Sequence, residues 1–333
     1  MHISSTLPKK ILAWYDNSKR KLPWRVGKKS PKKLYYRLLS EFMLQQTQVK
    51  TVIPYFIKFT KKFKTLKSLS NSNEKEILKM WEGLGYYRRA RNLLACSKLL
   101  VKNHKSRLPS SIAEIKKLPG VGDYTANALL GLVYNEPRIA LDVNVKRVFS
   151  RNLNVEEKKI EFHSLIKKNK KKLFNTKRHA DFVEALMEFG ALICKPKDPN
   201  CYTCCLNKTC KYFKSGKKIK NFRNKMIKNK TYDIFCHINK KKQIALTKNN
   251  QTSFLKNFNL PKIKEAQSHN KHQNWKFLKN YKNSISNLKL NINLYYKFSD
   301  RLPPKYNWYS LKNNKEFVPS FTKKIFRQVS ALF

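Results

Sequence analysis

Four cysteines near the middle of the chain are spaced so that one short loop could bring their thiolates together. The set is Cys194, Cys201, Cys204 and Cys210. A mononuclear zinc site usually combines two Cys-x-x-Cys pairs, and this loop has one, whereas an iron–sulfur cluster needs only four thiolates. Spacing alone therefore leaves zinc and an iron–sulfur cluster both open. The remaining thiols are expected to be bystanders: Cys96, Cys205 and Cys236.

Two carboxyl groups have the surroundings of a general acid and its partner. Glu41 lies among apolar residues on an expected helix, where burial would raise its pKa and keep it protonated. Asp142 precedes a second expected helix, and there it could simply be an N-cap. One protonated and one ionised carboxyl group are the usual means of cleaving a glycosidic bond. The bond between a base and deoxyribose poses the same problem, provided that the two side chains meet.

The segment Leu-Pro-Gly-Val-Gly-Asp-Tyr at residues 118–124 is typical of a helix–hairpin–helix motif. Gly120 and Gly122 permit a tight turn, and the helix that follows directs its positive end at the same place. A plain turn between helices is the simpler interpretation. The spacing of the two glycines favours a phosphate-binding site.

The composition agrees with a polyanionic partner but does not prove one. Lys and Arg number 73 against 20 Asp and Glu, which gives a formal net charge of +53. Nucleic acid is the obvious partner. However, lysine greatly outnumbers arginine, as A·T-rich codons would produce whatever the function. No apolar stretch suits a membrane span or a signal peptide, so we expect a cytoplasmic, nucleoid-associated monomer.

The apolar periodicity changes along the chain from helical to alternating. Residues 216–230 form a basic, apolar-poor run, which we interpret as a linker between domains 1–215 and 231–333. In the second domain, alternation predicts strands at 232–238 and 288–298, and a closing helix from Ser320. The fold class is therefore mainly α, with a small C-terminal α+β domain. The expected helices of the first domain are 8–20, 35–63 interrupted at Pro54, 74–81, 88–103, 111–117, 123–134, 143–151, 158–173 and 178–193.

Several motifs together resemble adenine DNA glycosylase (MutY), of the helix–hairpin–helix glycosylase superfamily. The similarity runs from residue 8 to residue 213 and rests on Leu-Pro-Trp-Arg (22–25), Ser-Glu-Phe-Met-Leu-Gln-Gln-Thr-Gln-Val (40–49), Gly-Leu-Gly-Tyr-Tyr-Arg-Arg-Ala-Arg-Asn (83–92), the hairpin, Asp142-x-Asn-Val-Lys-Arg-Val and the cysteine loop 194–210. The resemblance implies a two-lobed helical glycosylase fold with one [4Fe–4S] cluster. It also implies removal of adenine mispaired with 8-oxoguanine or guanine in double-stranded DNA.

The resemblance further implies roles for individual residues. Glu41 would protonate the adenine, and Asp142 would stabilise the cationic sugar. The other implied positions are Tyr124 and Asn144 beside these carboxylates, Trp24, Arg25 and Glu184 around the extruded adenine, Gln46 and Tyr86 as wedges in the base stack, and Gly120, Gly122, Lys146 and Arg147 near DNA phosphates.

Two alternatives compete with this assignment. Endonuclease III shares the fold and cluster but removes oxidised pyrimidines, using a lysine nucleophile where this chain has Tyr124. Because tyrosine cannot form a Schiff base, a lyase step through this position is excluded. The second alternative is a non-catalytic DNA-binding relic, and the presence of both Glu41 and Asp142 argues against it.

The chain departs from the family pattern at several positions. Val143 stands where glycine is usual, and Cys205 where proline is common. Residues 231–333 resemble, more weakly, the MutT-like (Nudix-fold) domain that reads 8-oxoguanine. Ser286 of the lesion-reading loop is present, but Asn287 and Lys289 replace two histidines. We therefore expect weakened discrimination between 8-oxoguanine and guanine. The Gly-x5-Glu hydrolase signature is missing, so no nucleotide hydrolysis is expected.

Overall fold

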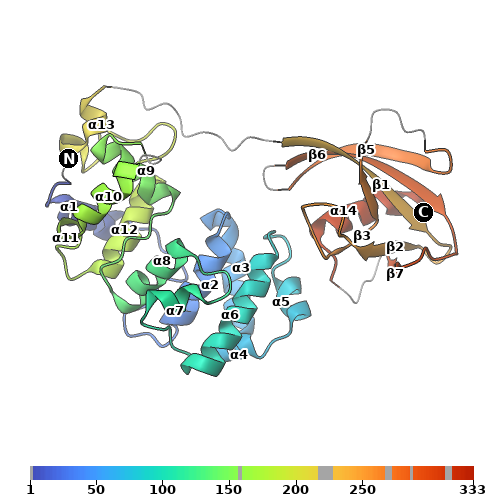
Figure 1. The fold of residues 1–333 in the computed structure, drawn as a ribbon, viewed down its shortest axis with the longest axis horizontal. Coiled ribbons are helices and arrows are strands. Elements are labelled where there is room, and N and C mark those ends of the chain that lie inside the picture. Colours follow the sequence, from blue (N-terminus) through green and yellow to red (C-terminus); the bar gives the residue numbers. More distant parts are fainter. Residues whose placement is uncertain (1–2, 157–159, 217–227, 267–271, 286–287, 312–316) are drawn as a thin grey trace. The chain divides into compact units, whose positions relative to one another are not determined.

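The computed structural model describes residues 3–156, 160–216, 228–266, 272–285, 288–311 and 317–333. The chain divides into two compact units, Met1–Phe222 and Arg223–Phe333 (Figure 1). None of the helices in the described ranges combines the length and the apolar composition that crossing a bilayer requires.

In the described residues of the first unit, every regular element is helical. The mainly helical class predicted from periodicity is confirmed for this unit. Its α-helices are α1 (Leu7–Ser18), α2 (Lys33–Leu44), α3 (Val49–Lys62), α4 (Leu66–Ser70), α5 (Glu74–Met80), α6 (Arg88–His104), α7 (Ile112–Lys116), α8 (Asp123–Tyr134), α9 (Val143–Leu153), α10 (Ile160–Lys168), α11 (Lys170–Leu173), α12 (His179–Leu192) and α13 (Lys211–Lys214), with a 3-10 turn η1 (Asn207–Thr209).

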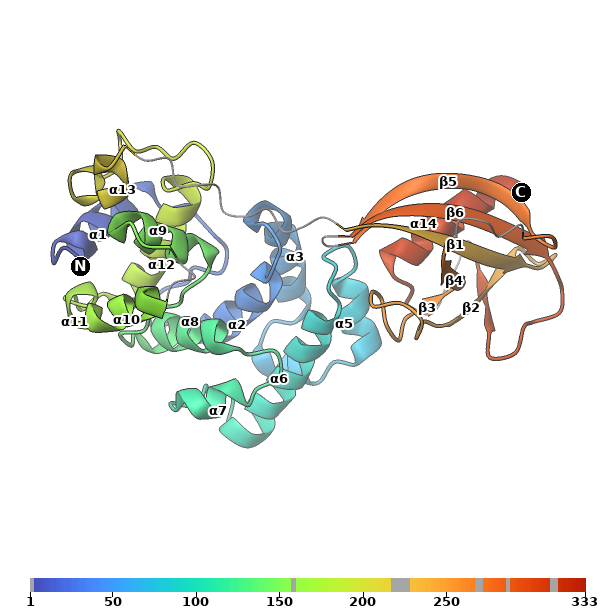
Figure 2. The same cartoon turned by 45° about the horizontal axis from the view of Figure 1, so that its top comes forward.

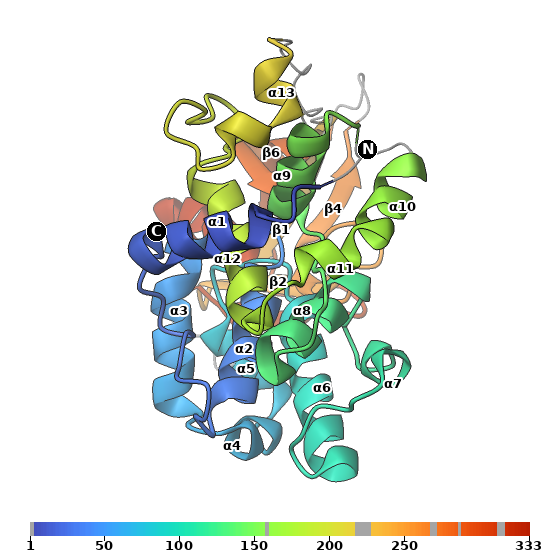
Figure 3. The same cartoon turned by 90° about the vertical axis from the view of Figure 1, so that its left-hand side faces the viewer.

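Helix α12 is central to the packing, because it contacts α1, α8 and α9 (Figure 3). Phe182 and Phe189 of α12 are buried in one apolar core with Ile11 of α1 and Phe149 of α9. A Cβ atom at Gly190 would lie 2.7 Å from Cβ of Asn144, so only glycine allows α12 and α9 to approach this closely. This contact fixes the start of α9, where Asp142 lies.

The predicted break between α2 and α3 is in the wrong place. Pro54 lies inside α3, and the two helices are separated instead at residues 45–48. A proline removes only one backbone hydrogen bond, and the buried Val52, Phe56 and Phe59 hold the helix on both sides of it. The actual break has a left-handed residue, Gln46, with φ +60°. The predicted helix at 158–173 is likewise two helices, α10 and α11.

The second unit is built on one seven-stranded sheet. The strand order is β3-β2-β1-β6-β5, with β4 paired to β1 and β7 paired to β2. Lys228–Lys230, predicted as the end of the linker, belong to β1. The strands are β1 (Lys228–Ile238), β2 (Gln243–Lys248), β3 (Asn259–Leu260), β4 (Lys262–Glu265), β5 (Lys276–Ile285), β6 (Leu288–Phe298) and β7 (Asn307–Ser310), followed by α14 (Ser320–Val329) and a 3-10 turn η2 (Ser330–Leu332).

One face of this sheet is covered by α14 (Figure 2). Ile325 and Val329 of the helix are fully buried with Ile234 of β1 and with Ile292 and Leu294 of β6. Since β1 and β6 run parallel in register, their alternate apolar residues point to the same side. The alternation predicted at 232–238 and 288–298, and the closing helix, are confirmed.

Candidate active site

Glu41 is a buried carboxyl group on α2, with 6 % of its surface exposed. Burial raises its pKa to about 7. A hydrogen bond from Tyr124 and the charge of Arg37 oppose this rise, while the carboxylates of Asp142 and Glu184 add to it. Such a group holds its proton near neutral pH, as expected for a general acid.

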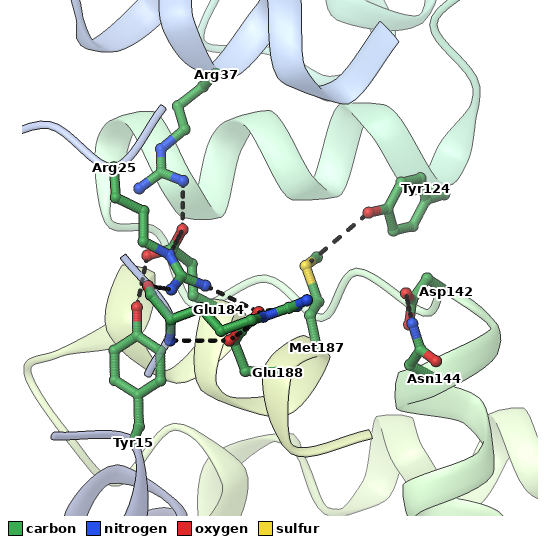
Figure 4. A network of polar contacts seen from close by, with 10 residues as sticks. Tyr15, Arg25, Arg37, Tyr124, Asp142, Asn144, Glu184, Met187 and Glu188 are labelled. Atoms are coloured by element: carbon green, nitrogen blue, oxygen red, sulfur yellow. Dashed lines mark hydrogen bonds and ion pairs between the residues drawn. The ribbon is translucent and has the colours of Figure 1, made fainter. Parts of the chain in front are cut away.

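Asp142 caps the N-terminus of α9 through its side chain. Its Oδ1 accepts a hydrogen bond from the Val145 backbone N–H at 2.6 Å. Its Oδ2 accepts one from Asn144 Nδ2 at 3.0 Å (Figure 4). Burial raises the pKa of Asp142, whereas these hydrogen bonds and the charge of Arg147 oppose the rise. The N-cap function and the predicted contact with Asn144 therefore coexist.

Tyr124, in the first turn of α8, brings the two carboxyl groups into one site. Its hydroxyl donates to Sδ of Met187 at 4.0 Å, and it is close enough to Glu41 to act on the pKa of that carboxyl group. Burial raises the pKa of Tyr124 well above its ordinary value, and the charges of Glu41 and Asp142 raise it further. Because Glu41 and Asp142 also act on each other electrostatically, these residues from α2, α8 and α9 form one cluster.

The hairpin before α8 depends on glycine at one of its two predicted positions. Gly120 has φ +78°, and a Cβ atom there would lie 2.8 Å from atoms of both Asn92 and Phe42. Gly122 is the N-cap of α8, with an ordinary φ of −97°, and a Cβ atom there would meet nothing within 4 Å. The helix start is therefore open on this side, as a phosphate site requires.

A second buried carboxylate, Glu184 of α12, lies at the centre of an ion-pair cluster (Figure 4). It accepts hydrogen bonds from Tyr15 Oη at 2.9 Å, from Arg25 Nε at 3.2 Å and from Arg37. Burial alone would raise its pKa, but the charges of Arg37 and Arg25 outweigh burial and lower the pKa. Glu188, one turn further along α12, pairs with Arg20 and Arg25 in the same way.

Two of the adenine-pocket positions predicted from the resemblance, Arg25 and Glu184, thus belong to an ion-pair cluster next to Glu41. Arg25 and Glu184 contact each other directly, and Arg37 of their cluster lies one turn before Glu41 on α2. Trp24 is 3 % exposed and packs edge-on against Phe56, with ring centroids 5.3 Å apart. No base-binding role is tested by these contacts, so that role stays a prediction.

The two predicted wedge residues are exposed and share an unusual backbone. Gln46 has φ +60° and Tyr86 has φ +49°, and the side chain of Tyr86 is 40 % exposed. Their loops are joined by Arg89, whose guanidinium donates to the carbonyls of Met43 and Gln45 on one loop and of Leu84 and Gly85 on the other. It also lies 5.4 Å from the Tyr86 ring centroid.

Arg89 was not singled out from the sequence, because a charged residue in a basic helix usually faces solvent. It is 7 % exposed, and burial lowers its pKa to about 10. The one available signal is its place within the Gly-Leu-Gly-Tyr-Tyr-Arg-Arg-Ala motif, directly after the loop that it fixes.

Arg147, predicted from the resemblance to lie near DNA phosphates, bonds to groups of the protein itself, and its proximity to DNA stays a prediction. Its guanidinium is buried and donates to Asn144 Oδ1 at 2.8 Å, to the Gly190 carbonyl at 2.6 Å and to the Cys194 carbonyl at 2.7 Å. Arg147 therefore positions Asn144, and through it Asp142, relative to α12 and the cysteine loop. Lys146 is partly exposed on the same helix and remains a candidate for phosphate contact. Ser286 lies outside the described residues.

The four predicted ligand cysteines line one small cavity of about 30 Å³ beside α9 and α12. Cys205 is not part of its wall, which agrees with a bystander role. In the portion of the chain that the structure describes, no three His, Cys, Asp or Glu side chains converge on a point that would hold a single metal ion. A four-iron cluster would take one thiolate per iron atom, so it does not require the four cysteine sulfurs to converge on one point.

The surroundings of this cavity suit an electron-rich group with several sulfur atoms. Nη1 of Arg151 lies 3.6 Å from Cys194 Sγ, and the Leu206 N–H lies 3.4 Å from Cys204 Sγ. Asn152 lines the cavity, is 6 % exposed, and its Nδ2 has no hydrogen-bond partner in the described chain. Burial and the neighbouring thiols raise the pKa of Cys204 to about 12, so a thiolate at this position needs a cationic centre. The residues present therefore fit an iron–sulfur cluster.

Comparison with known proteins identifies the class to which this fold and site belong. Residues 39–172 match the HhH-GPD superfamily of base excision DNA repair proteins. A thermostable thymine-DNA glycosylase is similar in structure, with a TM-score of 0.56 and 27 % identity over 63 % of this chain and 96 % of that one. An endonuclease III–DNA complex at 21 % identity, with a TM-score of 0.52, shares the fold. The helical unit is a helix–hairpin–helix DNA glycosylase.

Sequence relatives identify the family within this class of DNA glycosylases. Adenine DNA glycosylase of Buchnera aphidicola subsp. Baizongia pistaciae is 42 % identical over 72 % of this chain, which spans 63 % of that relative. The enzyme from the Acyrthosiphon pisum subspecies is 34 % identical over 95 % of both chains. The human enzyme is 34 % identical over 60 % of this chain and 38 % of its own length. The chain belongs to the adenine DNA glycosylase family, and the resemblance stated from its motifs is confirmed.

Proposed function

We propose that this chain hydrolyses the N-glycosidic bond of adenine paired with 8-oxoguanine or guanine in duplex DNA, as a monomer in the cytoplasm. The observation that carries the proposal is the cluster of Glu41, Tyr124 and Asp142, in which burial raises the pKa of Glu41 to about 7. The names of its relatives support adenine as the base that is released.

In this mechanism Glu41 delivers a proton to the departing adenine. With a pKa of about 7, about half of the Glu41 side chains are protonated at neutral pH. Protonation makes the base a neutral leaving group. The Tyr124 hydroxyl lies beside the carboxyl group, and after cleavage the carboxylate is the natural base for activating water.

Asp142 acts as the anion of the pair. Its oxygens accept hydrogen bonds from Val145 N and Asn144 Nδ2, which favour the charged form against the cost of burial. A fixed carboxylate stabilises positive charge that develops on the sugar as the base departs. Arg147 holds Asn144 in place, so Asp142 stays preorganised.

In this mechanism, the exposed side chains of Gln46 and Tyr86 extrude the adenine from the base stack. Unstacking a base costs a few kcal/mol, and a mispaired base costs least. Side chains held ready on rigid loops reduce this cost, and Arg89 supplies that rigidity. The hairpin at Gly120 and Gly122, together with Lys146, would hold the phosphates.

The reaction stops at base removal, because Tyr124 occupies the position of the lysine nucleophile in endonuclease III. We predict that Tyr124→Lys gains strand-nicking activity. The check is a denaturing gel of a labelled duplex after incubation without alkali. Unchanged products in a folded variant would contradict the proposed geometry.

We also propose that Cys194, Cys201, Cys204 and Cys210 bind one [4Fe–4S] cluster. When bound, the cluster supplies iron–thiolate bonds that tie the loop to α12. Asn152 would donate its unpartnered amide to a sulfur of the cluster. Anaerobically purified protein should be brown and contain iron and sulfide in equal amounts, and Asn152→Leu should bleach faster in air. Colourless protein with one zinc ion per chain would contradict the cluster.

The second unit would serve lesion recognition, following a linker that ends before Lys228. The replacement of both histidines by Asn287 and Lys289 predicts weak discrimination between 8-oxoguanine and guanine opposite adenine. Single-turnover excision from the two mispairs measures this preference. A preference as large as that of a histidine-bearing relative would contradict the prediction.

The whole proposal is tested by incubating the protein with an A:8-oxoguanine duplex and then with alkali, which cleaves abasic sites. Wild-type protein should give the product, and Glu41→Gln should lose it. A matched control is Glu76→Gln, the same change in a glutamate of α5 that is paired with Lys62 and lies outside the cluster of Glu41, Tyr124 and Asp142. Release of an oxidised pyrimidine instead of adenine would favour an endonuclease III-like activity.

A further inference from the structure

Arg37 is a buried arginine of α2 that the sequence motifs do not single out. It is 7 % exposed, and its Nη1 donates to Oε1 of Glu184 on α12 (Figure 4). Its Nε has no hydrogen-bond partner among the residues that the structure describes. Because a buried guanidinium N–H normally finds an acceptor, this unpaired donor indicates a partner that the resting protein does not supply.

The ion-pair cluster around Glu184 carries one positive charge in excess. In the described chain, its two carboxylates face three guanidinium groups: Glu184 and Glu188 face Arg20, Arg25 and Arg37. Arg20 and Arg25 both reach Glu188, whereas Arg37 pairs with Glu184. An uncompensated charge is costly where water is excluded, so this cluster is suited to pair with one more anion.

Glu41 follows Arg37 by one helical turn, on the same face of α2. Side chains four residues apart on a helix are neighbours, and both of these are buried. The charge of Arg37 lowers the pKa of Glu41 and so favours its carboxylate form. Among the described groups that act most strongly on Glu41, Arg37 is the cation. The others are the Tyr124 hydroxyl from α8, the Asp142 carboxyl group before α9 and Glu184 from α12.

We propose that Arg37 is a positioning residue of the reaction, which pairs with the Glu41 carboxylate that remains once Glu41 has given its proton to the adenine. The Glu41 O–H bond breaks and its electron pair stays on the carboxylate, while the proton forms an N–H bond on the adenine ring. The electron pair of the N-glycosidic bond leaves with the base, and the cationic sugar faces Asp142. The new buried anion needs a cation, and Nε of Arg37 is the unpaired donor one helical turn away. This inference rests on the proposed function and deepens it.

The direct test is a titration of Glu41 by ¹³C-carboxyl NMR in glutamate-labelled full-length protein, with the resonance assigned by its loss in Glu41→Gln. Arg37→Met removes the charge and keeps an apolar stem of similar length. In this variant Glu41 should titrate at higher pH than in wild type, because the cation that favours the carboxylate is gone. The matched control, Arg20→Met, removes a guanidinium of the same cluster that pairs with Glu188, and it should leave the titration of Glu41 unchanged.

A second comparison separates Arg37 from Glu184, whose charge is less compensated in Arg37→Met. In a Glu184→Gln background, Arg37→Met should again raise the pH at which Glu41 titrates. No shift in that background would show that Arg37 acts only by holding Glu184, and it would overturn the proposal. Equal shifts in Arg37→Met and Arg20→Met would overturn it as well. Melting curves establish that the variants are folded, and Arg37→Gln takes the place of Arg37→Met if that variant does not fold.

Single-turnover excision of adenine gives the functional counterpart of the titration. Arg37→Met should be about tenfold slower at its optimum, and the alkaline limb of its rate should shift to higher pH. Arg37→Lys keeps the charge, so it should keep the limb near that of wild type and regain part of the rate. A slower rate with an unshifted limb would indicate a merely structural role and would overturn the proposal. If wild-type protein released no adenine, the proposed function would fail, while the NMR titration would still decide whether Arg37 pairs with the Glu41 carboxylate.

Discussion

Glu41 and Glu184 are both buried glutamates of the helical unit, yet their proton affinities are shifted in opposite directions. The pKa of Glu41 is raised to about 7, whereas Arg37, Arg25 and Tyr15 lower that of Glu184 despite its burial. The difference lies in the charged partners: Glu184 accepts hydrogen bonds from two guanidinium groups and from Tyr15, whereas the neighbour of Glu41 is the neutral Tyr124 hydroxyl. Burial raises the pKa of a carboxyl group and favours its protonated form, whereas paired guanidinium groups lower the pKa and keep the carboxylate ionised.

The largest expected effect comes from Glu184→Gln, which leaves Arg37 without its anion and leaves Arg25 with Glu188 alone. Breaking a buried ion pair on one side costs about 3–5 kcal/mol, and this should appear in urea unfolding. Glu188→Gln should cost less, because its partner Arg20 is 34 % exposed and its other partner, Arg25, keeps Glu184. Equal losses in the two variants would contradict the view that the buried Arg37 makes the Glu184 cluster special.

The Glu184→Gln variant should also have a lower pKa at Glu41. The charge of Glu184 raises the pKa of Glu41 and that of Arg37 lowers it, so removing Glu184 lowers this pKa on both counts. The alkaline limb of the excision rate should therefore shift to lower pH. An unshifted limb would indicate that the two glutamates are electrically independent.

The next effect is a gain in stability from Glu41→Gln that depends on pH. The pKa of Glu41 in the folded state lies above its ordinary value of 4.5, so the folded state binds this proton more tightly. Stability is consequently lost as pH rises from 4.5 to about 7. The variant should gain nothing near pH 4.5 and up to about 3 kcal/mol above pH 7. The same gain at both pH values would refute the assigned pKa.

A smaller effect is expected at Arg89, a buried guanidinium that bonds to carbonyls rather than to a carboxylate. Arg89→Lys keeps the charge but cannot reach both wedge loops at once. We expect about tenfold slower excision under single-turnover conditions, with a smaller change for Arg91→Lys, whose partner Glu74 is exposed. The rate difference between the two variants is the measurement, and equal rates would remove Arg89 from the mechanism.

Local patterns were enough to predict the elements that carry the catalytic carboxyl groups. Glu41 lies within a helix marked by apolar spacing, and Asp142 directly precedes one, so both positions follow from short-range rules. The cysteine set follows from spacing together with the resemblance. The strands β1 and β6 alternate because one of their faces is buried.

The structural features that the sequence patterns missed or misplaced have a common physical cause. Arg147 and Arg89 donate hydrogen bonds to buried backbone carbonyls, including ones from distant segments of the chain. The residues that flank them in the sequence do not indicate these partners. Pro54 stays helical because tertiary packing outweighs one lost hydrogen bond. Strand β5 has few apolar residues, because it gains its order from pairing with β6. In each of these cases, contacts with residues distant in the sequence determine the local structure.

The pairing of an acid at Glu41 with an anion at Asp142 is the central claim, and the pH dependence of adenine excision tests it most directly. Single-turnover rates on an A:8-oxoguanine duplex, with protein in excess, should fall as pH rises through about 7, and Glu41→Gln should be inactive at every pH. A wild-type rate that stays level from pH 6 to pH 9, or a Glu41→Gln variant that still releases adenine at the wild-type rate, would contradict it.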